Sequence, residues 1–310
     1  MNQSFVTVDI RDILVGEPLP VALYIYIDFR FITFRGAGDV IDRAAFDRLQ
    51  FRKVKNLFIV DEDRDAFKAW LKSREAEGVL PEAVRKSSFG KIRDHVHRKM
   101  LDIFLSKHPD KIVREALNSS KKLVNEVMRF PFTSKSLSQL QTFSQGTVDH
   151  SVNVSVLATY LAMQMGYSHR LILQHVGMGA LLHDIGKSLI EITDDDSPAE
   201  AALKMRAHPT VGLKMLEAQP SVPKEVKLIV EQHHEAHDGS GYPKGLRGNA
   251  IYDLARIVGI SNRFDGLVAD GKGTLVERQR KAIYQLDQIH YRQFDPVKLD
   301  KALKILRLGV

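Results

Sequence analysis

The chain has 310 residues, enough for two domains, and its 44% apolar and 27% charged residues are typical of a globular protein rather than a disordered one. It contains no cysteine, which excludes disulfide bonds and thiolate metal sites. The net charge of +7 is spread along the chain, which favours a solvated surface over a groove for polymeric nucleic acid and is compatible with a nucleotide ligand. No apolar segment approaches the ~20 residues of a membrane span, so we expect a soluble cytoplasmic protein.

The first 78 residues predict a small α+β domain. Residues 23–34, LYIYIDFRFITF, alternate and are rich in β-branched and aromatic side chains, and residues 54–60, VKNLFIV, form an apolar run of strand length. Helical spacing occurs at residues 42–53 and again at 61–78, where acidic residues open the segment and Gly78 closes it.

From residue 79 the pattern is helical almost to the end. We assign 79–140 to a helical linker region, whose amphipathic helices would permit a homodimer, and 141–310 to a helical domain. The predicted fold class is mainly α, an all-helical domain preceded by a small α+β domain. Within the helical domain we predict helices at 151–166, 168–182, 197–204, 208–217, 223–235, 252–268, 274–286 and 297–308.

Several of the twelve histidines lie at predicted helix ends. His183 and Asp184, in ALLHDIGK, end an apolar helix, where a charged pair is costly to bury unless it is paired or binds a metal. His233 and His234 are adjacent and precede the turn DGSGYPKGL. Neighbouring residues of a helix diverge by about 100°, so both histidines reach one ion only at a helix end, which this turn supplies.

Taken together, these motifs resemble the HD-GYP group of the HD phosphohydrolase superfamily, whose members hydrolyse cyclic di-GMP. The resemblance covers about residues 140–270. It is carried by His150, His183, Asp184, Lys187, His208, HHE at 233–235 and DGSGYPKGL at 238–246.

The resemblance implies a binuclear metal centre for bacterial second-messenger signalling. His150, His183 and Asp184 are expected to bind one divalent ion, and Asp184, His208, His233 and His234 the other. Paired ions activate water and stabilise charge on a phosphodiester. Imidazole and carboxylate ligands without thiolates suit iron, manganese or zinc, and the resemblance favours iron or manganese, iron first.

Two residues are expected to be catalytic and a loop to bind substrate. Asp184 would bridge the ions and help to orient the attacking water, and Lys187 would contact the scissile phosphate. Gly241 and Tyr242 belong to a loop beside the active site, where Tyr242 either stacks on a guanine or packs against protein.

The chain departs from the family at three places. Asn262 stands where the family has an aspartate ligand, and Asp265, one turn later on the same helix face, is our choice for the last ligand, with Asn262 as the alternative. Gly146 stands where members with three metals carry a glutamate, which favours two ions. Gly271 replaces the arginine that grips substrate phosphate, so that only Lys272 offers a charge nearby.

The first functional hypothesis is therefore a metal-dependent phosphodiesterase that opens cyclic di-GMP to a linear dinucleotide, with or without further cleavage to GMP. The second is a catalytically weak or inactive module that binds metal and acts as a cyclic-dinucleotide sensor, or as an adaptor. The adaptor would contact other signalling proteins through residues 238–246, here called the GYP loop. A phosphohydrolase for another nucleotide is the third.

Overall fold

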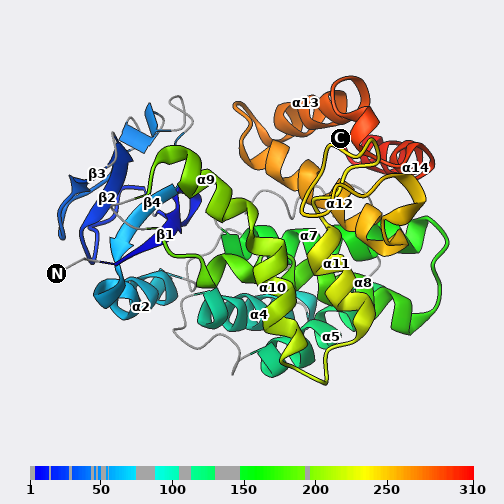
Figure 1. Ribbon diagram of the computed structural model, residues 1–310, viewed down its shortest axis with the longest axis horizontal. Coiled ribbons are helices and arrows are strands. Elements are labelled where there is room, and N and C mark those ends of the chain that lie inside the picture. The colour runs from blue at the N-terminus through cyan, green and yellow to red at the C-terminus, as the bar shows by residue number, and fades with distance from the viewer. Residues whose placement is uncertain are drawn as a thin grey trace.

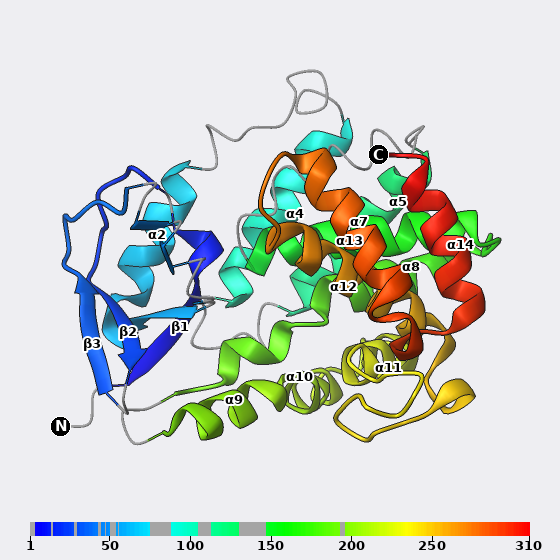
Figure 2. The same cartoon turned by 90° about the horizontal axis from the view of Figure 1, so that it is seen from above.

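The computed structural model divides into a small sheet and a larger helical bundle, with helix α9 running between them (Figures 1 and 2). The description below covers residues 4–13, 15–27, 30–42, 45–46, 48–49, 54, 56–74, 88–104, 113–129, 147–192 and 196–310.

The N-terminal part is a four-stranded antiparallel sheet in the order β1-β4-β2-β3. Its strands are β1 (Phe5–Asp9), β2 (Leu23–Ile27), β3 (Arg30–Arg35) and β4 (Asn56–Val60), and helix α2 (Arg64–Arg74) follows. The β structure predicted at 23–34 is a pair of strands, and that predicted at 54–60 is β4. Most of the helix predicted at 42–53 lies outside the described residues. So does the part beyond Arg74 of the helix predicted at 61–78.

The two faces of the sheet bury different side chains because residues alternate along a strand. Leu57 and Ile59 of β4 pack into an aliphatic core with Phe67 of α2. Phe58, on the other face, belongs to an aromatic cluster that packs against α9. The members of this cluster from the sheet are Phe5, Tyr24, Tyr26, Phe31, Phe58 and Val60; those from the other side are Ile192, Ala201 and Met205.

Helices make up the rest of the described chain. They are α4 (Ser88–Phe104), α5 (Val113–Arg129), α7 (Thr147–Gln164), α8 (Arg170–Leu182), α9 (Pro198–Arg206), α10 (His208–Glu217), α11 (Lys224–Gln232), α12 (Asp253–Ala269), α13 (Leu275–Gln288) and α14 (Pro296–Arg307). A mainly helical protein with a small α+β part at the N-terminus is thus confirmed. Among the described residues, no helix is long and apolar enough to cross a membrane.

Helix α7 is the centre of the bundle. Its residues from Ser151 to Ala162 are buried without interruption, as expected for a helix that is enclosed on all sides. Helices α4, α5, α8 and α12 pack around it, and α4 and α5 share its hydrophobic core. The boundaries at residues 78 and 140 remain a prediction.

Helix ends agree closely with the sequence signals. Ser197 caps α9 in a reciprocal capping box with Glu200, and Pro198 begins the helix. Helix α11 ends at Gln232, three residues before the predicted end at 235 and immediately before the histidine pair. Residues 130–146 lie outside the described residues.

One glycine fixes how the short helix after α8 meets α10. This 3-10 helix, η6 (Ile185–Leu189), places Gly186 so that an added Cβ would lie 2.1 Å from the carbonyl oxygen of His208 and 2.6 Å from the nitrogen of Gly212. Only a glycine permits this approach of two backbones.

We therefore expect Gly186→Ala to lower the free energy of unfolding by about 1–3 kcal/mol, the usual cost of overpacking. Gly266→Ala is the control, because a Cβ at this position of α12 meets nothing within 4 Å; it should raise stability by about 0.5–1 kcal/mol. Urea unfolding followed by circular dichroism measures both. Equal midpoints for the two variants would contradict the close approach.

Candidate metal centre

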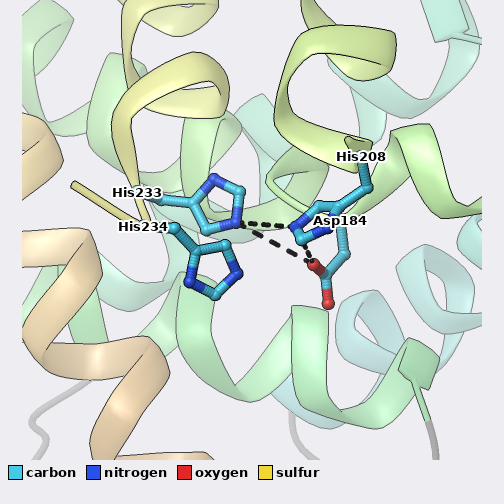
Figure 3. A group of neighbouring side chains, drawn as sticks. All are labelled: Asp184, His208, His233 and His234. Carbon is cyan, nitrogen blue, oxygen red and sulfur yellow. Dashed lines mark hydrogen bonds and ion pairs between the residues drawn. The ribbon is translucent and has the colours of Figure 1, made fainter. Parts of the chain in front are cut away.

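Six of the residues singled out from the sequence meet in the bundle. Asp184, His208, His233 and His234 form one group, and His150, His183 and Asp184 form another. Within each group, one ligand atom from every residue lies within 4.8 Å of the others. Asp184 is common to both, and Figure 3 shows how the histidines of the first group lie around its carboxylate.

The shared carboxylate is deeply buried. Asp184 is 1% exposed and follows α8, where its Oδ2 lies 3.3 Å from Nε2 of His183 and accepts a 2.7 Å hydrogen bond from Nζ of Lys187. Its Oδ1 lies 3.2 Å from Nε2 of His208 and 3.9 Å from Nε2 of His233. Burying an anion this far is expensive unless positive charge compensates it.

Three histidines are oriented by the last turns of three helices. Nδ1 of His183 bonds to the carbonyl of Ala180 at 2.7 Å, at the end of α8. His208 and His233 repeat this arrangement, with their Nδ1 atoms 2.8 Å from the carbonyls of Met205 in α9 and Val230 in α11. The last carbonyls of a helix have no partner within the helix, so they are free to accept these bonds.

These hydrogen bonds determine which nitrogen carries the proton. Because Nδ1 donates to a carbonyl, Nε2 of each neutral ring presents a lone pair to the interior of the group. Nε2 of His208 lies only 3.1 Å from Nε2 of His233, and both face Oδ1 of Asp184. Lone pairs this close repel one another, whereas a cation between them would bind to all of them.

The protonation states agree with this arrangement. Burial and the charge of His234 hold the pKa of His233 well below its usual value, and burial and the charge of His208 do the same for the pKa of His234. For Asp184, burial acts to raise the pKa, but attraction to His183 in its protonated form and to Lys187 outweighs burial and keeps the pKa well below the ordinary range. Neutral imidazoles and an ionised carboxylate are the forms that bind metals.

Polar atoms without partners point the same way. Nε2 of His183 and Oδ1 of Asp184 are fully buried and have no hydrogen-bond partner among the described residues. Buried polar groups are seldom left unsatisfied, so these two atoms are available as metal ligands. The residues present therefore fit a metal site.

His150 is held on both sides by helix α12. Its Nδ1 lies 2.7 Å from Oδ2 of Asp265, which is completely buried, and its Nε2 lies 2.9 Å from Oδ1 of Asn262. Asp265 thus contacts the ring nitrogen that faces away from Asn262. A carboxylate that accepts a hydrogen bond from a ligand histidine is a common outer partner in metal sites.

The GYP loop covers His234. The ring of Tyr242 stacks on the His234 ring with centroids 4.6 Å apart and 19° between planes, and the Tyr242 amide donates to the His234 carbonyl at 3.1 Å. Burial, with the nearby charge of Asp184, raises the pKa of Tyr242 to about 12, so its hydroxyl stays protonated at neutral pH.

Two further residues fix the shape of this loop. An added Cβ at Gly241 would lie 2.2 Å from the nitrogen of Ala236, so the loop can approach the end of α11 only with glycine there. The Glu235 carboxylate accepts hydrogen bonds from the amides of Lys244 and Leu246, at 2.7 and 2.8 Å.

Two predicted substrate contacts lie in different settings. Lys187 is paired with Asp184 and its side chain is one-third exposed. Lys272 is exposed in the turn between α12 and α13. The guanidinium of Arg206 lies over the Tyr242 ring, 4.6 Å from its centroid. The sequence analysis did not single out this residue. The one signal that it lies near the site was its position two residues before His208.

Comparison with known proteins agrees with this site. Residues 111–297 match the model of the HD domain family. The chain is 34% identical over 148 residues to a cyclic di-GMP phosphodiesterase of Pseudomonas aeruginosa, an alignment that covers 46% of this chain and 36% of that protein. It is 32% identical over 169 residues to the cyclic di-GMP phosphodiesterase response regulator RpfG of Xanthomonas campestris, covering 51% and 43%.

A related specificity also appears among the relatives. The chain is 31% identical over 169 residues to a 3′3′-cGAMP-specific phosphodiesterase of Vibrio cholerae, covering 52% of this chain and 36% of that protein. The alignments span less than half the length of each of these three relatives.

A solved structure shares the fold over nearly the whole chain. An HDG“Y”P protein from Bdellovibrio bacteriovorus superposes with a TM-score of 0.58 at 21% identity, covering 98% of this chain and 99% of that one. The family match, the relatives and the shared fold agree with the histidine and aspartate groups described above. The chain belongs to the HD-domain family and is a distant homologue of the HD-GYP cyclic di-GMP phosphodiesterases.

Proposed function

We propose that this protein is a metal-dependent phosphodiesterase that opens cyclic di-GMP to the linear dinucleotide. The observation that carries the proposal is the pair of buried ligand groups that share Asp184. Relatives of about 30% identity that carry the names of cyclic di-GMP phosphodiesterases support the choice of substrate.

The proposed cofactor is a pair of divalent ions, with iron preferred over manganese and zinc. His150, His183 and Asp184 would hold one ion, and His208, His233 and His234, again with Asp184, the other. A donor set of imidazole and carboxylate without thiolate supports this choice. When bound, paired ions lower the pKa of water and offset negative charge on phosphate oxygens.

The chain's own groups have distinct parts in this proposal. Asp184 holds the two halves of the site together and accepts a hydrogen bond from the attacking water. Lys187, which now donates to Asp184, turns its ammonium group toward the scissile phosphate when substrate is present. Gly241 and Tyr242 form the wall that the substrate contacts beside His234.

For the last metal ligand, we propose that Asp265 and Asn262 of α12 have different roles. Asp265 acts through His150, whose Nδ1 it holds at 2.7 Å, and so orients Nε2 toward the metal. Asn262, whose oxygen lies 2.9 Å from that Nε2, supplies the neutral oxygen ligand in place of the aspartate of the family.

A metal-binding module without turnover is the second candidate function. It is favoured by Gly271, which leaves the site without the arginine that grips phosphate in the family. In this case the GYP loop would serve as a contact surface for a cyclic dinucleotide or for another signalling protein.

Metal reconstitution separates these functions. Protein purified anaerobically and loaded with Fe²⁺ should contain two ions per chain and hydrolyse cyclic di-GMP. Asp184→Ala should lower metal affinity and turnover at least about 100-fold, because the loss of a bridging ligand costs no less than the loss of an outer partner. Metal analysis and chromatography of the nucleotides measure both.

Each other outcome has a definite meaning. Two bound ions without turnover of any cyclic dinucleotide would support the inactive module. Turnover of 3′3′-cGAMP alone would change the substrate but not the reaction. The absence of bound metal from the anaerobically loaded protein would refute the site.

The parts of Asp265 and Asn262 can be tested separately. Asp265→Asn should weaken metal affinity about 10- to 100-fold, because His150 loses its carboxylate partner, while both ions still bind at saturating metal. Asn262→Asp should strengthen binding, because it restores an anionic oxygen ligand. Titration with Mn²⁺ monitored by electron paramagnetic resonance gives both affinities.

Asp287→Asn is the matched control, since Asp287 lies on α13 in an exposed pair with Arg307. It should bind metal like the wild type. If Asp265→Asn loses one whole ion even at saturation, Asp265 is itself the last ligand, as the sequence first indicated.

A further inference from the structure

A stack of three side chains leads from the metal centre to the surface. His234 lies inside, the Tyr242 ring lies parallel to it at 4.6 Å, and the guanidinium carbon of Arg206 lies 4.6 Å from the centre of the Tyr242 ring. Arg206 ends α9 and is exposed. A cation over an aromatic face is attracted by the ring without using its N–H donors.

Among the described residues, no acidic side chain pairs with Arg206. Three lysines near this side of the bundle are paired: Lys187 with Asp184, Lys204 with Asp196, and Lys244 with Glu231. Among the described residues, the Arg206 side chain makes no ion pair and no hydrogen bond, and its guanidinium lies over the Tyr242 ring. All five of its N–H donors are therefore free to bind a ligand.

Both neighbours of this arginine are rigidly placed. Helix α9 is fixed at its start by the capping box and along its length by Ala201 and Met205, which pack against the sheet. The loop that carries Tyr242 is fixed by Glu235. A donor group that is already positioned loses less entropy when it binds.

We propose that Arg206 binds the second phosphodiester of the cyclic dinucleotide, the one that is not cleaved. This inference rests on the proposed function. The two phosphodiesters are the only charged groups of such a substrate, and the scissile one must face the metal ligands and Lys187. Arg206 lies, exposed, over the Tyr242 ring that stacks on His234, and there the remaining anion is the strongest partner for a guanidinium.

Arg206 also compensates for the phosphate-binding arginine of the family, which Gly271 replaces in this chain. The family's arginine at that place grips phosphate, and here Gly271 packs against the side chain of Arg278 instead. Arg206 supplies a guanidinium to the site from another helix.

The test compares Arg206→Gln and Arg206→Lys with Lys204→Gln, which removes one charge from the same helix at a residue that is paired with Asp196. Binding is measured with a phosphorothioate analogue of cyclic di-GMP that resists hydrolysis. Turnover is measured with cyclic di-GMP and with bis(4-nitrophenyl) phosphate, which has a single phosphodiester. Metal content is measured for every variant.

Arg206→Gln should raise the Kd of the analogue and the KM for cyclic di-GMP about 10- to 100-fold, the effect of losing a charged hydrogen-bonding partner. Metal content, kcat and the KM for bis(4-nitrophenyl) phosphate should stay at wild-type values. Arg206→Lys should be intermediate, because it keeps the charge and loses the fork of donors. Lys204→Gln should equal the wild type.

If Arg206→Gln binds the analogue with wild-type affinity, the inference about Arg206 is wrong, but the proposed function is unaffected. An equal loss for bis(4-nitrophenyl) phosphate would overturn it too, by assigning Arg206 to the scissile group. A metal-loaded wild type that neither binds the analogue nor hydrolyses cyclic di-GMP would refute the proposed function and the inference with it, and the wild-type measurement alone identifies this case.

Discussion

The arrangement of the bundle depends on one buried anion. Asp184 lies almost without exposure where α8, α10 and α11 meet, and the imidazole nitrogens that surround it present lone pairs rather than protons. Without a cation these groups would repel one another in a medium that screens charge poorly. The helices around Asp184 therefore pack in a way that is most stable when positive charge occupies their junction.

The hydrogen bonds at the helix ends satisfy two physical requirements at once. A helix leaves its last carbonyls without internal partners, and a metal-binding imidazole needs a fixed proton on the nitrogen that does not bind. Ala180, Met205 and Val230 each lie in the last turn of a helix, and the carbonyl of each accepts a hydrogen bond from Nδ1 of the histidine three residues later. The helix therefore has to end near each ligand, which explains why these histidines stand beside breaks in the helical pattern.

Much of this was predictable, because the signals are local. Apolar spacing predicted the helices of the bundle, and the breakers after His234 predicted the end of α11 to within three residues. The partners of side chains were not predictable. The spacing of Asn262 and Asp265 put both on one face of a helix, but only the packing of α12 on α7 brings Asp265 to the far nitrogen of His150. Arg206 was missed because its partner, Tyr242, is 36 positions away in another loop.

The aromatic face of the N-terminal sheet gives α9 a second role. Met205 packs its side chain into the aromatic cluster with Phe5 and Phe58, while its carbonyl holds the ring of His208. One residue is thus shared by the two parts of the molecule, and the next residue is Arg206. A shift of the sheet against the bundle has to carry α9 with it or break this packing. A movement of the sheet would therefore reach the metal centre through α9, a helix of nine residues that contacts both.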